Sequence, residues 1–432
     1  MGAPLERALV AGSFIVAFVV VPHALAGDDF TRYDDIRQLL DHGRLTDSKY
    51  SLVMPLVSAP FLELGHVVRS PQWWAARFNV ILLAVGAVVA ARLLRDRADR
   101  ALLRRTLLVL LCASLLANRL RDYNAEVLTA TLIALGIVCI ATGRYVAAGW
   151  GAIVVGAVNT PAAVVALVPV AALEAFRRRR LRHLLPLAAA AVLVLGEAWL
   201  RRGSPFHTGY GNDHGVATIL PYSGRPGFSY PFLLGISSIL FSFGRGLLFF
   251  TPGLALWLDS RTRRAAARHR RALVPMLLFV VALVLVYAKW WAWYGGLSWG
   301  PRFFAFAAIP ASVLLVLRIG RAGESAVADL VTLGVLALSV WVGVVGLIAD
   351  SSALGFCARD NYALESLCWY VPEYSSLWHP ILHAPALTRS TAIVSAWCAI
   401  VAVYLAAPLL STFARSARAT PPALAWTRGW RV

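Results

Sequence analysis

Long apolar runs recur along the whole chain and alternate with short polar segments. A helix needs about 20 apolar residues to cross roughly 30 Å of hydrocarbon, and many of these runs approach that length. With the N-terminus taken as cytoplasmic, crossings are expected near residues 7–26, 77–94, 106–120, 124–142, 145–158, 161–176, 184–200, 247–259, 272–288, 303–317, 326–348 and 391–411. The pattern predicts an all-α polytopic membrane protein of about 12 transmembrane helices, forming one integral membrane domain over residues 1–432.

Composition and charge agree with this class of protein. The chain is 59% hydrophobic and 15% charged, which is unlike an average soluble protein. Its net charge of +19 comes from arginines that cluster between the apolar runs, so it indicates the positive-inside rule rather than nucleic-acid binding. Twelve crossings place every such cluster, 92–105, 177–183, 260–271, 318–321 and the tail from 415, on the cytoplasmic side. The first run also resembles a signal peptide, but an uncleaved first helix accounts for it.

The same count places three long loops, 27–76, 201–246 and 349–390, on the opposite face. Nearly all acidic, aromatic and cysteine-containing motifs fall on that face, so we expect chemistry on the extracytoplasmic side of the membrane. Cys357 and Cys368 share the last loop, where an oxidising compartment favours a local disulfide.

The first long loop opens with four aspartates in "DDFTRYDDIRQLLDHG". From Thr31 to Gly43 the apolar spacing predicts a short amphipathic helix on the membrane surface, with Tyr33 on its apolar face and the glycine as its stop. Thr31 and Asp34 resemble a capping box. Asp34 and Asp35 are therefore expected to be ordinary carboxylates in a first helical turn.

Asp28 and Asp29 precede that predicted helix, at the membrane boundary, where an unpaired carboxylate is costly. One interpretation is an N-cap or an interface residue. The other is a general base that takes a proton from an acceptor hydroxyl.

Three cations and one further acid have comparable positions. Lys49 precedes the proline-broken apolar stretch "YSLVMPLVSAPFLELG", which predicts a re-entrant or interfacial segment, and it either reaches the headgroups or holds a phosphate. Arg245, between glycines in an apolar run, needs an anionic partner such as a lipid headgroup or a substrate. Arg302 follows Gly-Pro at a helix entrance, where a guanidinium suits a phosphate. Glu126, at or inside the boundary, is a functional candidate for the same reason.

Together these residues resemble the GT-C superfamily of membrane glycosyltransferases, which use sugars linked to polyprenyl phosphate. The first crossing followed by "DDFTRY" is similar to the family's acidic motif in the first outer loop. "SKYSLVMPLVSAPFLELG" resembles the segment that follows in bacterial members such as aminoarabinose transferases and protein O-mannosyltransferases. "FSFGRGLLFFTPGLAL" and "WYGGLSWGPRFF" are similar to stretches in other bacterial members.

The resemblance implies a GT-C fold and a single inverting displacement. Asp28 or Asp29 acts as the catalytic base, and the family often has Asp-Glu where this chain has Asp-Asp, which leaves the choice open. Lys49, Arg302 and Arg245 match basic positions that suit the donor phosphate. The expected substrate-binding residues are Glu126, Tyr294, Trp299 and Tyr33.

The resemblance also sets the expected partners. The composition, rich in Ala, Arg and Val and poor in Lys, is typical of a high-GC genome such as an actinobacterial one. Within the family, such a source favours arabinofuranose or mannose on decaprenyl phosphate as donor and an envelope glycan or glycolipid as acceptor. Family members differ in metal dependence, so a Mg²⁺ or Mn²⁺ cofactor stays open. The rival interpretations are a transporter or lipid-linked-sugar flippase and an assembly subunit of an envelope complex. Against a transporter, the two halves share no similarity and the polar candidates gather on one face.

Overall fold

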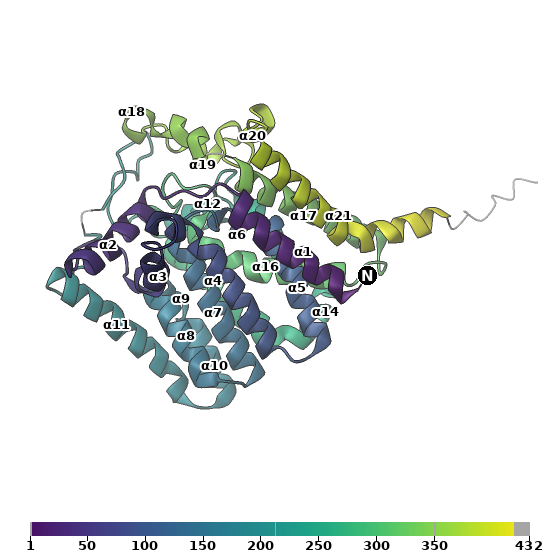
Figure 1. The fold of residues 1–432 in the computed structure, drawn as a ribbon, viewed down its shortest axis with the longest axis horizontal. Coiled ribbons are helices and arrows are strands. Elements are labelled where there is room, and N and C mark those ends of the chain that lie inside the picture. The colour runs from purple at the N-terminus through teal and green to yellow at the C-terminus, as the bar shows by residue number, and fades with distance from the viewer. Residues whose placement is uncertain (1, 212, 350, 419–432) are drawn as a thin grey trace, which may run out of the picture.

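The computed structural model describes residues 2–211, 213–349 and 351–418, and its regular elements are helices (Figure 1). The α-helices are α1 (Ala3–Ile15), α2 (Asp28–His42), α3 (Val53–Leu64), α4 (Pro71–Leu93), α5 (Arg97–Cys112), α6 (Leu115–Arg119), α7 (Ala125–Thr142), α8 (Val146–Asn159), α9 (Ala162–Ala166), α10 (Val168–Arg178), α11 (Leu185–Arg202), α12 (Phe232–Phe241), α13 (Leu247–Phe250), α14 (Ser260–Ala265), α15 (Arg270–Tyr287), α16 (Ala308–Ile319), α17 (Ala326–Ile348), α18 (Arg359–Tyr362), α19 (Leu367–Tyr370), α20 (His379–Leu382) and α21 (Arg389–Arg418). A π-helical turn, Val16–Val20, extends α1, and 3-10 segments cover Leu181–Leu184, Pro252–Leu258, Ala266–His269, Arg302–Ala307, Ser351–Ala358 and Pro372–Tyr374.

Within the described residues, 8 helical stretches are long and apolar enough to cross a membrane. They are Ala3–Val20, Pro71–Leu93, Ala125–Thr142, Leu181–Arg202, Ser260–Tyr287, Arg302–Ile319, Ala326–Ile348 and Arg389–Ala414. Each coincides with a predicted crossing. The fold is therefore that of an all-helical, multi-pass membrane protein.

The other four predicted crossings are short or interrupted. The run 106–120 is divided between α5 and α6, and 161–176 between α9 and α10. Helix α8, at 14 residues, is shorter than a span. The run 247–259 breaks at Thr251 (φ −136°, ψ 56°), because the following Pro252 disfavours helical geometry in the residue before it.

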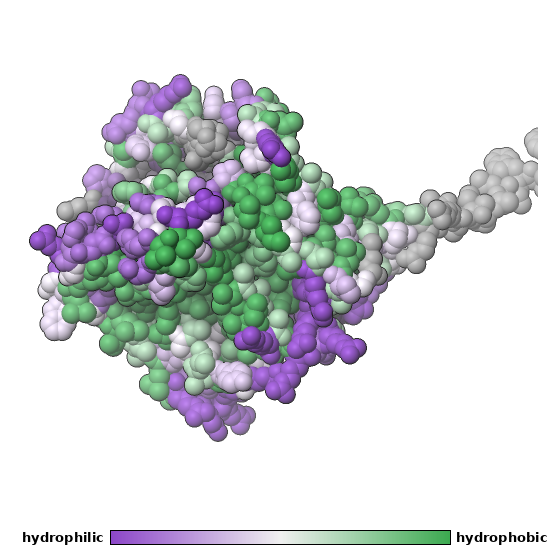
Figure 2. Space-filling model, in the orientation of Figure 1, coloured by the Kyte–Doolittle hydropathy of each residue, from purple (hydrophilic) through white to green (hydrophobic). Residues whose placement is uncertain are grey.

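On the face shown in Figure 2, a hydrophobic band crosses the middle of the molecule between two hydrophilic ends. One end carries α2 and α18, and we call it the site end (Figure 1). The other lies beyond α10 and α14, whose last turns hold arginines, and we call it the arginine end. The predicted separation of acidic and aromatic loops from arginine-rich loops is thus present in space.

Helices α7 and α8 pack closely enough for their backbones to touch. A methyl group on Gly136 would lie 2.4 Å from the carbonyl oxygen of Gly149. Small residues permit such approaches between membrane helices. This pair supports the turn before α7, which forms one wall of the candidate site.

Candidate active site

A cavity of about 660 Å³ lies at the site end, and we call it the central cavity. Five parts of the chain line it. They are the connection into α2 (24–29), the turn from α6 to α7 (118–124), residues 214–216, residues 291–302, and a last part that includes Tyr362 and Glu365. Asp28, Asp29 and Arg302 therefore share one cavity, although their positions in the sequence are far apart.

Helix α2 begins earlier than the sequence indicated. Gly27 has φ +55°, a conformation that glycine adopts readily, and it turns the chain so that Asp28 and Asp29 form the first helical turn. The predicted start at Thr31 is wrong, because α2 already begins at Asp28. No side chain caps the N-terminus of this helix, so the predicted capping box is absent as well. The predicted stop is confirmed: Gly43 ends α2 with φ +64°.

This shift changes the roles expected for the second aspartate pair. Asp35 is not a solvated first-turn carboxylate. It is buried and accepts hydrogen bonds from Thr46 at 2.5 Å and from Arg201 at 3.5 Å. It fixes the underside of α2 to α11, so that the helix is held in place from below.

The Asp28 carboxylate forms an ion pair with Arg302, at 2.6 Å between Oδ2 and Nη2. It also accepts a hydrogen bond from the Tyr50 hydroxyl. Burial alone would raise the pKa of Asp28, but the charge of Arg302, the Tyr50 hydrogen bond and the charge of Arg32 together hold that pKa below its usual value. Asp28 is therefore an ionised, oriented carboxylate that faces the cavity.

Asp29 has a different environment. Burial raises its pKa to about 7, although the charge of Arg32, 3.3 Å away, opposes that rise. The nearby charges of Asp122 and Glu126 raise it further. Two adjacent carboxyl groups thus have pKa values pushed in opposite directions, an arrangement common in acid–base sites.

Arg302 follows a glycine-rich turn whose Gly295, Gly296 and Gly300 have positive φ. A methyl group on Gly295 would lie 2.9 Å from Cγ of Arg302, so the turn can follow the guanidinium side chain only with glycine there. Among the described residues, the buried Nε of Arg302 has no hydrogen-bond partner. The guanidinium keeps a donor that is not used by Asp28.

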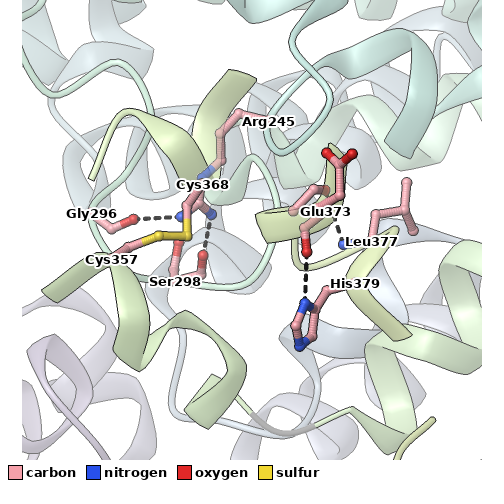
Figure 3. Close-up of a disulfide and its surroundings, with 9 residues drawn as sticks. Arg245, Gly296, Ser298, Cys357, Cys368, Glu373, Leu377 and His379 are labelled. Carbon is pink, nitrogen blue, oxygen red and sulfur yellow. Dashed lines mark hydrogen bonds between the residues drawn. A yellow bond between two sulfur atoms is a disulfide. The ribbon is translucent and has the colours of Figure 1, made fainter. Parts of the chain in front are cut away.

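Arg245 does not occupy the position expected of a phosphate ligand. It is buried, is absent from the cavity lining, and donates to the carbonyl oxygens of Gly296 (2.8 Å), Gly300 (2.7 Å) and Ser298 (Figure 3). These three carbonyls belong to the turn that leads to Arg302. Backbone oxygens thus supply partners to both Nη atoms of Arg245, while its buried Nε has none among the described residues.

Lys49 also lies outside the cavity lining. Its Nζ pairs with Asp213 at 2.7 Å and lies 5.2 Å from the centre of the Tyr210 ring. Tyr50, the next residue, is the one that contacts Asp28. Lys49 is therefore one residue removed from the contact with Asp28.

Two of the expected substrate-binding aromatics line the cavity and one does not. Tyr294 and Trp299 are wall residues. Tyr33 instead packs in an apolar cluster with Ile36 and Met54 beneath α2, as the amphipathic pattern of that helix requires. Its predicted contact with substrate does not fit this position.

Glu126 lies behind the cavity wall, in the first turn of α7. With its amide turned to satisfy both neighbours, Asn124 donates to Glu126 Oε2 at 2.6 Å and accepts from Arg119 at 3.3 Å. Glu126 does not line the cavity. It contacts Asn124, which does, and its charge raises the pKa of Asp29.

Cys357 and Cys368 form a disulfide, with 6.2 Å between their Cα atoms. The bridge lies beside Arg245 and the turn that holds Gly296 and Ser298 (Figure 3). A methyl group on Gly244 would lie 1.8 Å from the carbonyl oxygen of Cys368, so the disulfide segment packs directly on the chain that carries Arg245.

Sequence reasoning missed three groups at this site: Arg119, Tyr50 and Glu365. Arg119 lines the cavity and donates to the Trp299 carbonyl at 2.7 Å. Two of them stood beside noted features, since Tyr50 follows Lys49 and Glu365 lies between the paired cysteines. Adjacency to a candidate was the available signal.

A divalent metal ion would need several carboxylate or other ligand side chains close together. Across residues 2–211, 213–349 and 351–418, no group of three or more His, Cys, Asp or Glu side chains is close enough to hold a metal ion. Asp28 is already paired with Arg302. The described residues therefore offer no set of ligands for a divalent metal ion.

The fold and this cavity define a class: a helical membrane protein with a GT-C-like fold. No protein-family model and no curated protein sequence matches the chain. Among solved structures, it is similar to ArnT from Cupriavidus metallidurans in the apo state, over 96% of this chain and 78% of ArnT, with 16% identity and a TM-score of 0.50. The resemblance in sequence motifs is thus matched by the fold.

Two further structures are similar at lower scores. ArnT bound to undecaprenyl phosphate matches over 96% of this chain and 79% of that one, with 16% identity and a TM-score of 0.49. The arabinosyltransferase EmbB from Mycobacterium smegmatis matches over 96% of this chain and 41% of that one, with 15% identity and a TM-score of 0.46. At such identities we take the fold alone from apo ArnT.

Proposed function

We propose that this protein is an inverting glycosyltransferase that moves a sugar from a polyprenyl-phosphate donor to an envelope glycan or glycolipid. The observation that carries the proposal is the Asp28–Arg302 ion pair at the wall of the central cavity. A base and a cation adjoining one sugar-sized space are what this reaction needs. The GT-C-like fold shared with ArnT agrees with it.

The chemical step uses Asp28 as the base. The acceptor O–H gives its proton to the Asp28 carboxylate while its oxygen forms a bond to the anomeric carbon. The bond from that carbon to the phosphate oxygen breaks, and polyprenyl phosphate leaves with the electron pair. Asp28 is preferred over Asp29 because its side chain is 27% exposed against 10% for Asp29.

The ion pair also couples the two halves of the step. Once Asp28 is protonated, its attraction for Arg302 falls, and the guanidinium becomes available to the phosphate as negative charge develops there. Lys49 remains a candidate phosphate ligand, and Tyr294 and Trp299 are candidate contacts of a sugar ring in the cavity.

The proposal includes the orientation in the membrane. Twelve crossings, with four made by the short or divided helices, place the arginine end in the cytoplasm and the central cavity on the extracytoplasmic side. Arabinofuranose and mannose are the proposed sugars, on decaprenyl or undecaprenyl phosphate.

The test is transfer by purified protein in liposomes. Labelled polyprenyl-phosphoryl arabinofuranose or mannose is supplied with an envelope-lipid extract, and both labelled product and released polyprenyl phosphate are measured. Transfer by the wild-type chain, and none by Asp28→Asn, supports the proposal. Movement of intact donor between leaflets without transfer would replace it with a flippase.

A further inference from the structure

The carboxyl groups that line the central cavity are those of Asp28, Asp29, Asp122 and Glu365, and Glu365 has no role in the step above. Glu365 is 9% exposed and belongs to the segment that includes the disulfide. It accepts a hydrogen bond from the Tyr294 hydroxyl. Trp291 and Trp299 line the same cavity.

The segment around Glu365 is held rigidly. Tyr294 stacks on Trp369, with 4.0 Å between ring centres. The backbone N–H of Gly244 donates to the Trp369 carbonyl at 2.9 Å. Together with the nearby disulfide, these contacts fix the carboxyl group before any ligand binds, which favours specific recognition.

The wall also contains hydrogen-bond donors that lack partners. Among the described residues, the buried indole N–H groups of Trp291 and Trp299 donate to nothing. A buried donor left unpaired is unfavourable. Both indole nitrogens are covered in this structure, so the two tryptophans offer a ligand in the cavity aromatic walls rather than donors.

The protonation of Glu365 suits a ligand that carries hydroxyl groups. Burial raises its pKa to about 7, although the Tyr294 hydrogen bond and the charge of Arg245 lower it. Near neutral pH the group can accept a hydrogen bond or donate one. A sugar hydroxyl also does both.

We infer that Glu365, Tyr294, Trp291 and Trp299 form the acceptor subsite and bind a carbohydrate ring. Glu365 holds one hydroxyl of that ring while another hydroxyl faces Asp28 across the same cavity. This inference rests on the proposed function, because it assigns the acceptor of that reaction. It makes the acceptor end that enters the site a sugar rather than a peptide or a phospholipid headgroup.

Binding without turnover tests this subsite. The full-length protein in nanodiscs is titrated with soluble methyl disaccharides of arabinofuranose and of mannose, and binding is followed by tryptophan fluorescence and saturation-transfer NMR. We expect wild type to bind at least one of them. Glu365→Ala and Tyr294→Phe should weaken that binding about 10-fold or more, while Glu365→Gln, which can still donate and accept, should weaken it less.

Two controls separate this subsite from the donor site and from general damage. Decaprenyl phosphate, titrated into the same variants, should bind as it does to wild type. Glu373→Gln removes a charge from an exposed residue of the same loop region and should leave disaccharide binding unchanged. Equal thermal unfolding of all variants shows that they are folded.

The outcomes distinguish this inference from the proposed function. If no disaccharide binds wild type, or if Glu365→Ala and Tyr294→Phe bind disaccharide as tightly as wild type does, the subsite is wrong, whatever the transfer assay gives. If disaccharides bind through Glu365 but no donor is ever consumed, the carbohydrate site stands and the transferase fails.

Discussion

Arg302 and Arg318 stand at the two ends of one membrane span, Arg302–Ile319, and each pairs with an aspartate. At the arginine end, Arg318 meets Asp329 at 2.8 Å, and both side chains are 1% exposed. At the site end, Arg302 meets Asp28 at 2.6 Å, with 19% and 27% of the side chains exposed. The two ion pairs look alike in distance and differ in what surrounds them.

The pair at the arginine end is closed on all sides. Asp329 also accepts from the Gly323 N–H at 2.8 Å and from Thr412, and Arg318 also donates to the Arg321 carbonyl. The pair at the site end adjoins a cavity and keeps an unused Nε donor. A buried ion pair with every partner filled supports structure, whereas one with open positions can exchange partners, as catalysis requires.

The largest expected effect on turnover comes from breaking the ion pair at the site end by a substitution of Asp28. Asp28→Asn removes the proposed base and keeps its size, so turnover should fall by about 10²–10⁴-fold. Donor binding and thermal unfolding should stay near wild type. Labelled-donor transfer measures the first, and wild-type turnover in this variant would remove Asp28 from the mechanism.

The matched change at the other end should act on stability instead. Asp329→Asn leaves the Arg318 guanidinium buried beside only Asp259, 3.8 Å away, and should destabilise the fold by about 3 kcal/mol. Transfer per folded molecule should be unchanged. Denaturation followed by tryptophan fluorescence measures this, and a loss of activity without loss of stability would contradict the contrast.

A smaller effect is expected when the charge at Arg302 is kept but its shape is changed. Arg302→Lys retains a cation and loses the planar fork, so binding of decaprenyl phosphate should weaken about 10-fold. Arg225→Lys, an exposed position on a loop at the site end, is the control and should change nothing. Equal donor binding in both variants would exclude Arg302 from the phosphate site.

The pH profile sharpens the choice between the two adjacent aspartates. A general base works only when deprotonated, so a base with the raised pKa of Asp29, about 7, would lose turnover as pH falls below neutral. The lowered pKa of Asp28 predicts turnover at saturating acceptor that stays level from pH 8 to about 5. A profile that falls by half near pH 7 would favour Asp29.

Long helices could be predicted because their signal is local. Each of the 8 long spans contains a long apolar run, and the length of that run identifies it. The divided runs were harder, since the break at Thr251 depends on its proline neighbour while the run stays apolar. For the same reason the start of α2 was missed: a capping-box pattern at Thr31 is visible in the sequence, whereas the turn at Gly27 depends on backbone geometry.

The sequence indicated which charged residues gather at the candidate site, but it did not indicate which partner each of them contacts. Asp28, Asp29 and Arg302 carry charges where charge is unfavourable, and that signal was sufficient. Arg245 gave the same signal, but its partners are backbone oxygens, which no sequence pattern reveals. Glu365 gave only the signal of its place between the paired cysteines, because its environment is created by Tyr294 and the distant Arg245.

The Asp28–Arg302 contact has a consequence for biosynthesis. Its two residues are about 270 positions apart, and at roughly 5–20 residues per second the ribosome needs about 15–55 s to travel from one to the other. During that interval the carboxylate has left the first helix and lacks the guanidinium of Arg302. The site is therefore among the last features that the nascent chain completes, and a protein truncated before residue 302 would be inserted in the membrane without it.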